Sequence, residues 1–449
     1  MDRLTLKTSL EMMTQILSCE IDETVNQHIT AAVSGYVAGE DDALLNQLYQ
    51  KEFTVRVEQE DGSDKYLFRG IVQEAEIINE GKLKKLTVRA ASHTARLDVD
   101  KKLRAFQDVE KTYQTVTSYI VSQYSEKIGI IYVPETKGTL PELMVQYRET
   151  DWEFLKRLAS KLGLALAADI HNSYPCFYFG MPERKLIELE DVTDYQVCCR
   201  AQGAGKLEYE MECRQLLGLC AAVKFLGSRF RVYRKKIRLD EGALAVRYTL
   251  RREEGFWQEA YEREELTGCS LMGTVKSVRE DKVRIELDCE DVRGENSKEY
   301  PYATVYSSPD GTGWYCMPEE GDRVRLYFPD GNEDHGYAAS AVHLGAVDDK
   351  RKNPEEKSIR TIYDKEVRFT PNKILITNHK GMQILLDDEK GIEIKSGKQI
   401  SLRSSDGIDL ISGGKIAVEG ENGIILNENE NFLIIRDGIR INGLDIQFK

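Results

Sequence analysis

Histidine, tryptophan and proline are scarce in this chain, with six, three and ten copies among 449 residues. The histidines are dispersed, and no His-Glu-x-x-His or Cys-x-x-Cys pattern indicates a zinc site. The sequence also lacks a Gly-x-x-x-x-Gly-Lys phosphate loop, a Gly-x-Gly-x-x-Gly fingerprint and a Gly-x-Ser-x-Gly nucleophile elbow. We therefore expect no catalytic residue, no metal and no cofactor, and we interpret the chain as non-enzymatic.

Long apolar runs are absent as well. No stretch approaches the ~18 apolar residues of a membrane-spanning helix, and the opening residues MDRLTLKTSLEMM do not resemble a signal peptide. The nine cysteines have no disulfide-framework spacing, so we predict nine thiols and a cytoplasmic, reducing environment. The formal net charge of −14 argues against nucleic acid as a partner.

An eight-residue repeat occupies the C-terminal part of the sequence. Pairs of apolar residues two positions apart recur every eight residues between 384 and 434, and this spacing places both members on one face of a strand. Most residues between the pair members are polar, so the other face is expected to contact water. Gly391, Gly407 and Gly423 recur at one phase and predict corners with unusual backbone dihedrals. The predicted core residues are Ile384, Leu386, Ile392, Ile394, Ile400, Leu402, Ile408, Leu410, Ile416, Val418, Ile424, Leu426, Phe432 and Ile434.

One such octad cannot enclose a hydrophobic core, because it spans only about 25 Å at ~3.3 Å per residue. Single-chain β-solenoids use repeats of roughly 20 residues or more. Two arrangements remain. The octads could form an up-and-down meander, which leaves an apolar face uncovered, or three chains could together form a triangular prism. In the prism, three octads close each turn and the apolar pairs meet on the axis. We favour the prism and keep the meander as the alternative.

The octad repeat resembles the needle of the contractile-tail spike family, which comprises phage tail-spike hubs and the VgrG proteins of type VI secretion and related injection systems. The resemblance implies a homotrimeric, intertwined β-helix over residues 360–449. It also implies a tip protein of the PAAR-repeat kind at the open end, where Leu444, Ile446 and Phe448 alternate. Some needles of this family end in a His-x-His metal site, and this chain has no histidine after His379.

The N-terminal half predicts a β-rich hub. Residues 1–20 fit either a short helix or a strand, and alternating apolar residues over 22–97 predict the strands of a small barrel. Residues 165–265 return to strand character and predict a second barrel. The charged stretch Glu253–Glu265 at its end is predicted to be a helical connector.

Two helices are expected between these barrels. Apolar residues at helical spacing cover 113–128, and Gly129 is the predicted stop. Thr150 and Glu153 predict a capping box for the second helix, in which Trp152 should pack in the core. The segment that carries it, YRETDWEFLKRLASKLGLAL, also resembles the Trp-Phe-Leu helix in the hub of the same family.

Dense turn signals over 267–344 predict an OB-type barrel of five strands. Val324, Leu326 and Phe328 alternate with polar residues and should face its core. The stretch GTGWYCMPEEGDRVRLYFPDGN is similar to strands that lie between hub and needle in the spike family. A polar segment around Pro354 reads as a linker.

These patterns predict a mainly β protein with an α+β hub of two barrels at 1–265, an OB-fold domain at 266–346, a linker at 347–359 and a spike at 360–449. The resemblance implies a structural baseplate hub and membrane-piercing spike of a contractile injection system, whether phage tail, tailocin, extracellular injection system or type VI secretion. Such a chain would be assembled in the cytoplasm and delivered outside the cell or into a target on contraction.

The implied partners are two further copies of the chain, the inner tube or its initiator protein, other baseplate proteins, the PAAR-like tip protein and, mechanically, the target envelope. The alternative function is a cell-wall hydrolase or a spike that carries an effector enzyme. We disfavour it because only about fifteen residues separate the barrel from the first needle strands, and the chain stops at Lys449.

Overall fold

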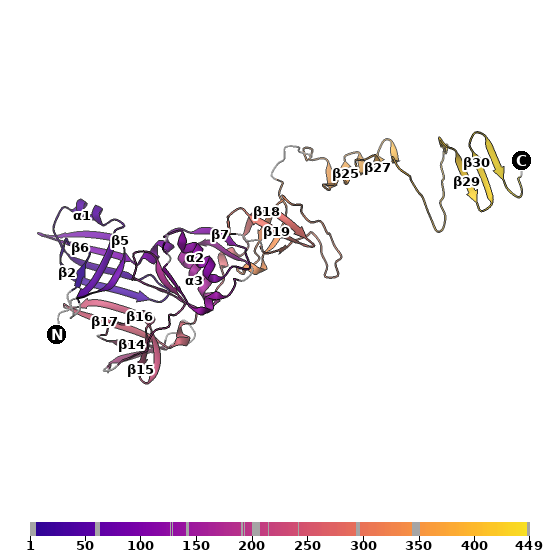
Figure 1. The fold of residues 1–449 in the computed structure, drawn as a ribbon. Coiled ribbons are helices and arrows are strands. Elements are labelled where there is room, and N and C mark those ends of the chain that lie inside the picture. The colour runs from indigo at the N-terminus through magenta and orange to yellow at the C-terminus, as the bar shows by residue number, and fades with distance from the viewer. Residues whose placement is uncertain are drawn as a thin grey trace. The chain divides into compact units, whose positions relative to one another are not determined.

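The computed structural model describes residues 6–58, 63–125, 127, 129–140, 143–189, 192, 194–199, 207–213, 215–240, 242–292, 297–343 and 351–446. The chain divides into two compact units, residues 1–344 and 345–449, and each is described by itself (Figure 1). No described helix has the length and apolar character needed to cross a membrane.

The largest element of the first unit is a twelve-stranded sheet. Its main path runs β1-β4-β5-β6-β3-β2-β16-β17-β14-β13. Off this path, β15 pairs with β16 and also with β12. The strands are β1 (Leu6–Thr8), β2 (Met13–Thr24), β3 (Thr30–Val37), β4 (Glu52–Glu58), β5 (Asp64–Glu80), β6 (Leu83–Ala91), β12 (Ile187–Glu188), β13 (Tyr195–Cys199), β14 (Leu207–Glu212), β15 (Ala222–Phe225), β16 (Ser228–Asp240) and β17 (Ala243–Arg251).

The two predicted groups of hub strands share this one sheet. β2 pairs with β16 through partners such as Ile21 and Ile237, both fully buried, and one apolar core extends through both groups. The sequence of residues 1–20 fitted either a helix or a strand. The described residues of this stretch contain the strands β1 and β2. The prediction of a mainly β, barrel-like hub is confirmed.

The described residues of the hub form three α-helices: α1 (Asp41–Leu48), which was not predicted, α2 (Tyr113–Ser122) and α3 (Asp151–Lys161). The capping box of α3 is confirmed, because Thr150 Oγ1 accepts the Glu153 N–H at 3.1 Å and Glu153 accepts the Thr150 N–H at 3.0 Å. Trp152 is buried and packs edge-on against Phe177, as expected of a core residue.

Two local predictions in the hub are wrong. Gly129 does not stop a helix, because α2 ends at Ser122 and Gly129 begins strand β8 (Gly129–Tyr132). The connector over 253–265 forms only the short 3₁₀ turns η3 (Glu253–Phe256) and η4 (Glu264–Leu266). Its backbone is held by tertiary contacts instead, since Gln258 donates its N–H to the Gly163 carbonyl at 3.1 Å.

Residues 270–339 form a five-stranded antiparallel sheet in the order β21-β19-β18-β22-β23. Tyr302 bridges to Ala338 in parallel, which joins the two edges of this sheet into a small barrel. Val324, Leu326 and Phe328 are fully buried, as their alternation predicted. The strands are β18 (Ser270–Arg279), β19 (Lys282–Leu287), β21 (Tyr300–Pro301), β22 (Arg323–Tyr327) and β23 (Tyr337–Ala339).

Small sheets complete the first unit and link the barrel to the hub. One contains β8, β10 (Leu166–Ala168) and β11 (Cys176–Phe179), and the other contains β7 (Lys102–Phe106), β9 (Met144–Glu149) and β20 (Glu290–Val292). β20 follows the barrel strand β19 in sequence and pairs in parallel with the hub strand β7. Because of this pairing, the hub residues Ala105 and Val145 pack in the core of the barrel.

A buried ion network reinforces the same junction. Arg157 of α3 is fully buried; it donates two hydrogen bonds of 2.9 Å to Glu149 and one of 2.6 Å to Glu333 of the barrel. A fourth bond, of 2.7 Å, reaches the Val145 carbonyl. Burial acts to lower the pKa of Arg157, but Glu333 and Glu149 outweigh that effect and raise it. The guanidinium therefore stays charged and ties hub to barrel.

The second unit consists of strands that pair with their neighbours in sequence. A first sheet runs in the order β24-β25-β26-β27-β28 and a second in the order β29-β30-β31. The predicted linker ends early, because β24 starts at Lys357; residues 347–350 lie outside the described part of the chain. The strands are β24 (Lys357–Arg360), β25 (Glu366–Thr370), β26 (Lys373–Thr377), β27 (Met382–Asp387), β28 (Gly391–Ser396), β29 (Ile424–Glu428), β30 (Asn431–Ile435) and β31 (Ile439–Asn442).

Replacing Arg157 by methionine should destabilise the first unit by about 3–5 kcal/mol, because two buried carboxylates would lose their partner. Urea unfolding followed by tryptophan fluorescence reports on this unit, since all three tryptophans lie in it. The matched control is Arg247→Met, which breaks an exposed pair with Glu212 and should cost less than about 1 kcal/mol. Equal losses of unfolding free energy in the two variants would contradict the conclusion that Arg157 stabilises the junction between hub and barrel.

Candidate assembly surface

The first C-terminal sheet (β24–β28) has one face that is almost entirely apolar. The register sets Ile384 opposite Ile394 and Leu386 opposite Ile392. Apolar partners recur in the other strand pairs, and at the margins of the face Lys357 lies opposite Phe369 and Ser396 opposite Met382. Cross-strand partners point to the same side of a sheet. The apolar face therefore consists of Ile359, Val367, Phe369, Ile374, Ile376, Ile384, Leu386, Ile392 and Ile394.

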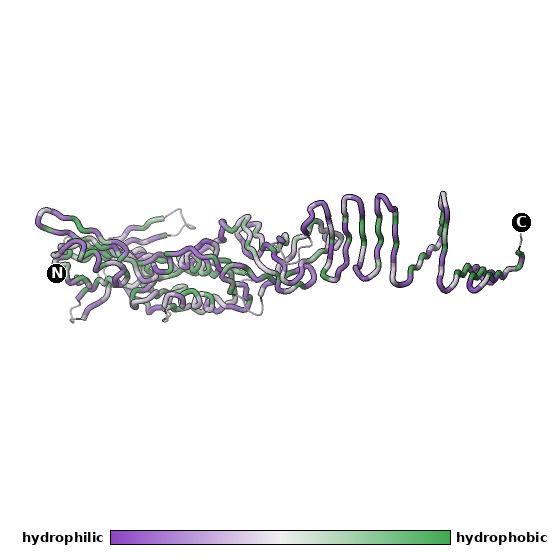
Figure 2. Tube along the Cα trace, turned by 90° about the horizontal axis from the view of Figure 1, so that it is seen from above, coloured by the Kyte–Doolittle hydropathy of each residue, from purple (hydrophilic) through white to green (hydrophobic). Residues whose placement is uncertain are grey.

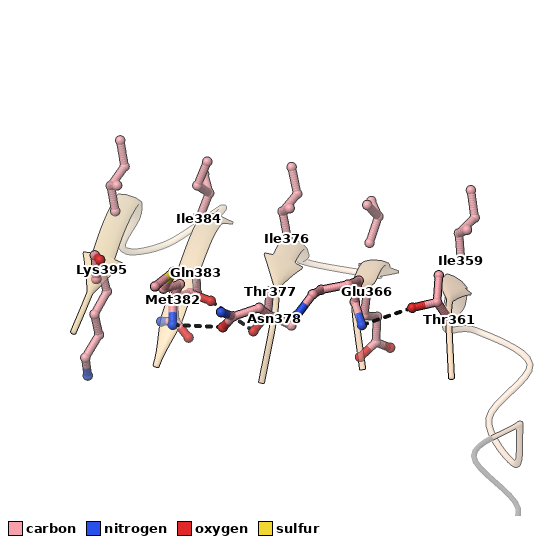
Figure 3. Close-up of a pocket in the computed structure, with 14 residues that line it drawn as sticks. Ile359, Thr361, Glu366, Ile376, Thr377, Asn378, Met382, Gln383, Ile384 and Lys395 are labelled. Atoms are coloured by element: carbon pink, nitrogen blue, oxygen red, sulfur yellow. Dashed lines mark hydrogen bonds between the residues drawn. The ribbon is translucent and has the colours of Figure 1, made fainter. Parts of the chain in front are cut away.

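The apolar face is uncovered in the single chain. Eight of its nine residues are between 37 and 74 % exposed, whereas the hub core is almost fully buried. Figure 3 shows Ile359, Ile376 and Ile384 extending to the same side of their strands. A hollow of about 590 Å³ lies along these residues. Thr361 and Lys395, near the two outer strands of the sheet, also line it. A contiguous exposed apolar surface of this kind indicates an interaction site.

The opposite face of the first sheet is polar and supplies its own partners. Glu366 is buried there and accepts hydrogen bonds of 2.7 Å from Arg368 and 2.5 Å from His379. Burial acts to raise the pKa of Glu366, but the bonds from Arg368 and His379 outweigh burial and lower it. Asp387 accepts two backbone N–H groups and pairs with Lys373 at 3.2 Å. The polar face thus has its buried carboxylates paired, whereas the apolar face is exposed.

The predicted core residues of β27 and β28 lie on the apolar face, but their arrangement differs from the prediction. Consecutive octads of a prism should lie on different faces, and here Ile384/Leu386 and Ile392/Ile394 are neighbours in one sheet of one chain. This correction follows from the turn between them, in which Gly391 takes a left-handed φ of 84° and the chain reverses.

The second C-terminal sheet (β29–β31) departs from the octad rhythm. Its register pairs Ile424 with Ile435 and Leu426 with Leu433, so Phe432 and Ile434 lie on the face opposite Ile424. The cause is the two-residue turn at Asn429, whose φ of 50° closes a tight hairpin and shifts the strand by one position. The face that carries Ile424 and Leu426 is completed by Leu433, Ile435, Ile439 and Ile441.

The middle three octads form no strand at all in the single chain. Their six predicted core residues are 51 to 69 % exposed. Figure 2 shows the segment between the two sheets leaving the regular zigzag of strands. Gly407, unlike Gly391 and Gly423, has no left-handed φ, so the expectation of unusual dihedrals at that glycine is wrong. These residues are Ile400, Leu402, Ile408, Leu410, Ile416 and Val418.

The predicted tip residues lie at the end of the described chain. Leu444 is fully exposed and Ile446 is 45 % exposed, while Phe448 lies outside the described residues. Both line a hollow of about 520 Å³ beside β30 and β31. The binding of a tip protein here stays a prediction.

The apolar face also includes residues outside the predicted core list. Val367 and Phe369 keep the two-residue spacing of the octads, as do Ile374 and Ile376, and the sequence places these four residues as leading into the octads. They fall outside the eight-residue rhythm because the intervening turns differ in length. In the described part of the chain, no group of three or more His, Cys, Asp or Glu residues is arranged to hold a metal ion.

Comparison with known proteins identifies the class of fold. Residues 22–171 match the family model of the phage tail baseplate hub (GPD). A search of curated proteins finds no match. The chain is therefore similar to the phage tail baseplate hub over residues 22–171, about a third of its length.

Solved structures extend the likeness over most of the chain. One is an Escherichia coli protein, c3393, described as a type VI secretion component similar to the T4 tail proteins gp27 and gp5. Its TM-score is 0.55 at 15 % identity, covering 76 % of this chain and all of that one. The PdpA–VgrG complex of Francisella, in a half-lidded form, gives a TM-score of 0.56 at 9 % identity and covers 85 % of this chain and 84 % of that one. The chain has the fold of VgrG-like hub proteins.

The ion cluster around Glu366 predicts an acid-sensitive first sheet. A carboxyl group whose pKa is lowered by folding stabilises the fold above its unfolded pKa, and this contribution is lost as the pH falls through the lowered value. We expect Glu366→Gln to reduce hydrogen-exchange protection of β25 and β26 at about pH 7, and the difference from wild type to shrink as the pH falls below the unfolded glutamate pKa of about 4.3. Mass spectrometry of the exchanged peptides measures both. Glu393→Gln, on the exposed part of the same face, is the control and should change little. Equal protection of wild type and Glu366→Gln at neutral pH would refute the role of the cluster.

Proposed function

We propose that the chain is a homotrimeric baseplate hub and membrane-piercing spike of a contractile injection system. The hub domain at 22–171 and the VgrG-like fold support the first part of this proposal. The observation that carries the second is the apolar face of the first C-terminal sheet, which is exposed in one chain and backed by a self-sufficient polar face. Under this proposal, the apolar face of the first C-terminal sheet is the surface that other copies of the chain cover.

Three copies of the chain together would bury the apolar face of each first sheet. Each first sheet would form one side of a triangular prism, with the apolar faces inside and the polar faces in water. Each apolar side chain removed from water contributes about 1.5–3 kcal/mol, and the nine positions of the apolar face recur in every copy. Because the gain requires all three chains, the spike has no stable folded monomer under this proposal.

The mechanism is mechanical. A prism with a dry interior and continuous strand ladders resists bending, since deforming it would expose apolar side chains along its length. The buried contacts of Arg157 connect the barrel to the hub, so a push on the hub reaches the barrel without a flexible joint between them. The hub would adapt the needle to the inner tube and contact the other baseplate proteins. Sheath contraction would then drive the assembly from the cytoplasm through a target envelope.

The tip is proposed to bind a PAAR-like protein. Leu444 and Ile446 are exposed at the end of the described chain, and Phe448 continues their alternation in the sequence. Three copies of this segment would present a ring of apolar side chains, which a cap would shield from water. No catalytic step is assigned to any residue of the chain.

The two adjacent leucines of β27 test the trimer. Leu386 lies on the apolar face and Leu385 on the polar face. Leu386→Asp would place three carboxylates in the dry interior and should abolish the trimer, because buried unpaired charges are strongly unfavourable. Leu385→Asp makes the same chemical change on the water-facing side and should leave the trimer intact.

Sedimentation equilibrium measures the outcome. The wild-type chain and Leu385→Asp should sediment at three times the 51.2 kDa mass of one chain, and Leu386→Asp should sediment as a monomer or aggregate. A wild-type chain that stays at 51.2 kDa, or a stable dimer, would overturn the proposed spike.

A further inference from the structure

A hollow of about 800 Å³ lies in the first unit and is lined by both groups of hub strands. Its lining residues come from β5 of the first group, from β16 of the second, from β10 and β11, and from the loop 216–219. We call this space the hub hollow. Its volume falls in the range of about 300–1,000 Å³ that is typical of small-molecule sites. All of these lining residues belong to one chain, so the hub hollow exists independently of the proposed trimer.

Part of the lining of the hub hollow is apolar. Six apolar residues of the lining are more than nine-tenths buried, and they are Ile29, Leu67, Ala167, Ala168, Leu217 and Leu219. The loop that carries the last two is held by Tyr248, whose hydroxyl donates to the Gln215 carbonyl at 2.7 Å and accepts the Leu217 N–H at 2.9 Å. The apolar lining is thus already in place to contact the apolar part of a ligand.

Three acidic side chains also line the hub hollow, and each contacts a basic side chain. The pairs are Glu23 with Lys235 at 2.6 Å, Asp64 with Arg56 at 3.1 Å and Asp169 with His171 at 2.5 Å. Arg69 is engaged as well, because it donates to the His171 carbonyl at 2.7 Å and lies 3.3 Å from Glu52. These charged groups of the lining therefore already have partners.

Two further cations of the lining, Lys65 and Arg184, form no ion pair with any residue that the structure describes. Lys65 Nζ donates to the Leu216 carbonyl at 3.4 Å, and Arg184 Nη2 donates to the Tyr178 hydroxyl at 3.2 Å. Burial and the nearby charge of Lys235 lower the pKa of Lys65. The hub hollow thus holds two unneutralised positive charges, although the chain as a whole has a net charge of −14.

Both unpaired cations border the same short loop. Lys65 binds the Leu216 carbonyl, and a Cβ added at Gly218 would lie 3.4 Å from Arg184 Nη1. Residues 216 and 218 are separated by at most about 7 Å of extended chain. Lys65 comes from β5, whereas Arg184 lies between β11 and β12. Two segments distant in sequence therefore bring their positive charges to one place beside the apolar lining.

We propose that the hub hollow binds a small organic phosphate monoester, with its phosphate between Lys65 and Arg184 and its organic part against the apolar lining. A phosphate monoester carries a charge of about −1.5 to −2 at pH 7 and has three strong acceptor oxygens. It therefore neutralises both cations, whereas a carboxylate carries one charge and neutralises one. The bound ligand would also connect β5 to the segment of Arg184 and so stabilise the hub.

Isothermal titration calorimetry of the full chain with phenyl phosphate tests the site. The wild type should bind one ligand per chain with a dissociation constant below about 1 mM. Lys65→Met and Arg184→Met should each weaken binding about tenfold or more, because each removes a hydrogen bond to a charged group. The matched control is Lys224→Met, which removes an exposed lysine outside the lining that pairs with Glu188, and it should bind as the wild type does.

Two simpler ligands test the chemical class. Benzoate keeps the ring but carries one charge, and inorganic phosphate keeps the charge but lacks the ring. Each should bind about tenfold more weakly than phenyl phosphate, because each loses one of the two kinds of contact. Equal affinity of either ligand and phenyl phosphate would overturn the assignment to an organic phosphate. A wild-type chain that gives no binding heat with phenyl phosphate at about 10 mM would overturn the site itself.

Thermal unfolding of the same variants separates a binding role from a structural one. Because Lys65 and Arg184 have no acidic partner among the described residues, their replacement should not lower the Tm of the ligand-free protein. It should instead reduce the rise in Tm that phenyl phosphate produces in the wild type. A lowered ligand-free Tm together with an unchanged ligand-induced rise would overturn the proposal. A chain that binds phenyl phosphate but sediments as a monomer would overturn the proposed spike and leave this site standing.

Discussion

The apolar face of β24–β28 is the constraint on which the second unit depends. An antiparallel sheet can leave its polar side in water, and here the buried carboxylates of the polar side contact Arg368, His379 and Lys373. The other side offers nine apolar residues, and the described residues of the unit leave eight of them 37 to 74 % exposed. In the single chain, the carboxylates of the polar face are thus hydrogen-bonded, whereas the apolar side chains of the other face remain in contact with water.

The first unit buries its apolar side chains within one chain. Its sheets pack around apolar cores, and charged side chains such as Asp151 that lie in the interior have hydrogen-bond partners. Asp151, fully buried, receives Lys102 at 2.8 Å, Arg104 at 2.7 Å and the Tyr124 hydroxyl at 2.6 Å. Buried networks of this kind are stable only when every member is satisfied, which also fixes the geometry of the elements that carry them. The closed apolar cores of the first unit and the exposed apolar face of the second are therefore two consequences of where the chain places its apolar and charged residues.

The parts of this structure that were predictable are those set by local patterns. Thr150 and Glu153 identified the start of α3, and the alternation of Val324, Leu326 and Phe328 identified a barrel strand, because each signal lies within a few residues. The register of the second C-terminal sheet was not predictable, since Phe432 and Ile434 keep the rhythm and only the turn at Asn429 reveals the shift. The pairing of β20 with β7 and the bond from Arg157 to Glu333 join distant segments and leave no local trace.

The octads show why periodicity alone underdetermines such a structure. An apolar pair two residues apart specifies which face of a strand is buried, and nothing in the pair specifies which strand lies next to it. That information resides in the turns. Gly391 and Gly407 occupy the same phase of the repeat. Gly391 has a left-handed φ and follows a turn in which the Asp387 carboxylate accepts the Glu389 N–H, whereas Gly407 has no left-handed φ and donates its N–H to Ser404 Oγ. Whether the chain folds back beside its previous strand is therefore decided by a few corner residues, which the apolar rhythm alone does not reveal.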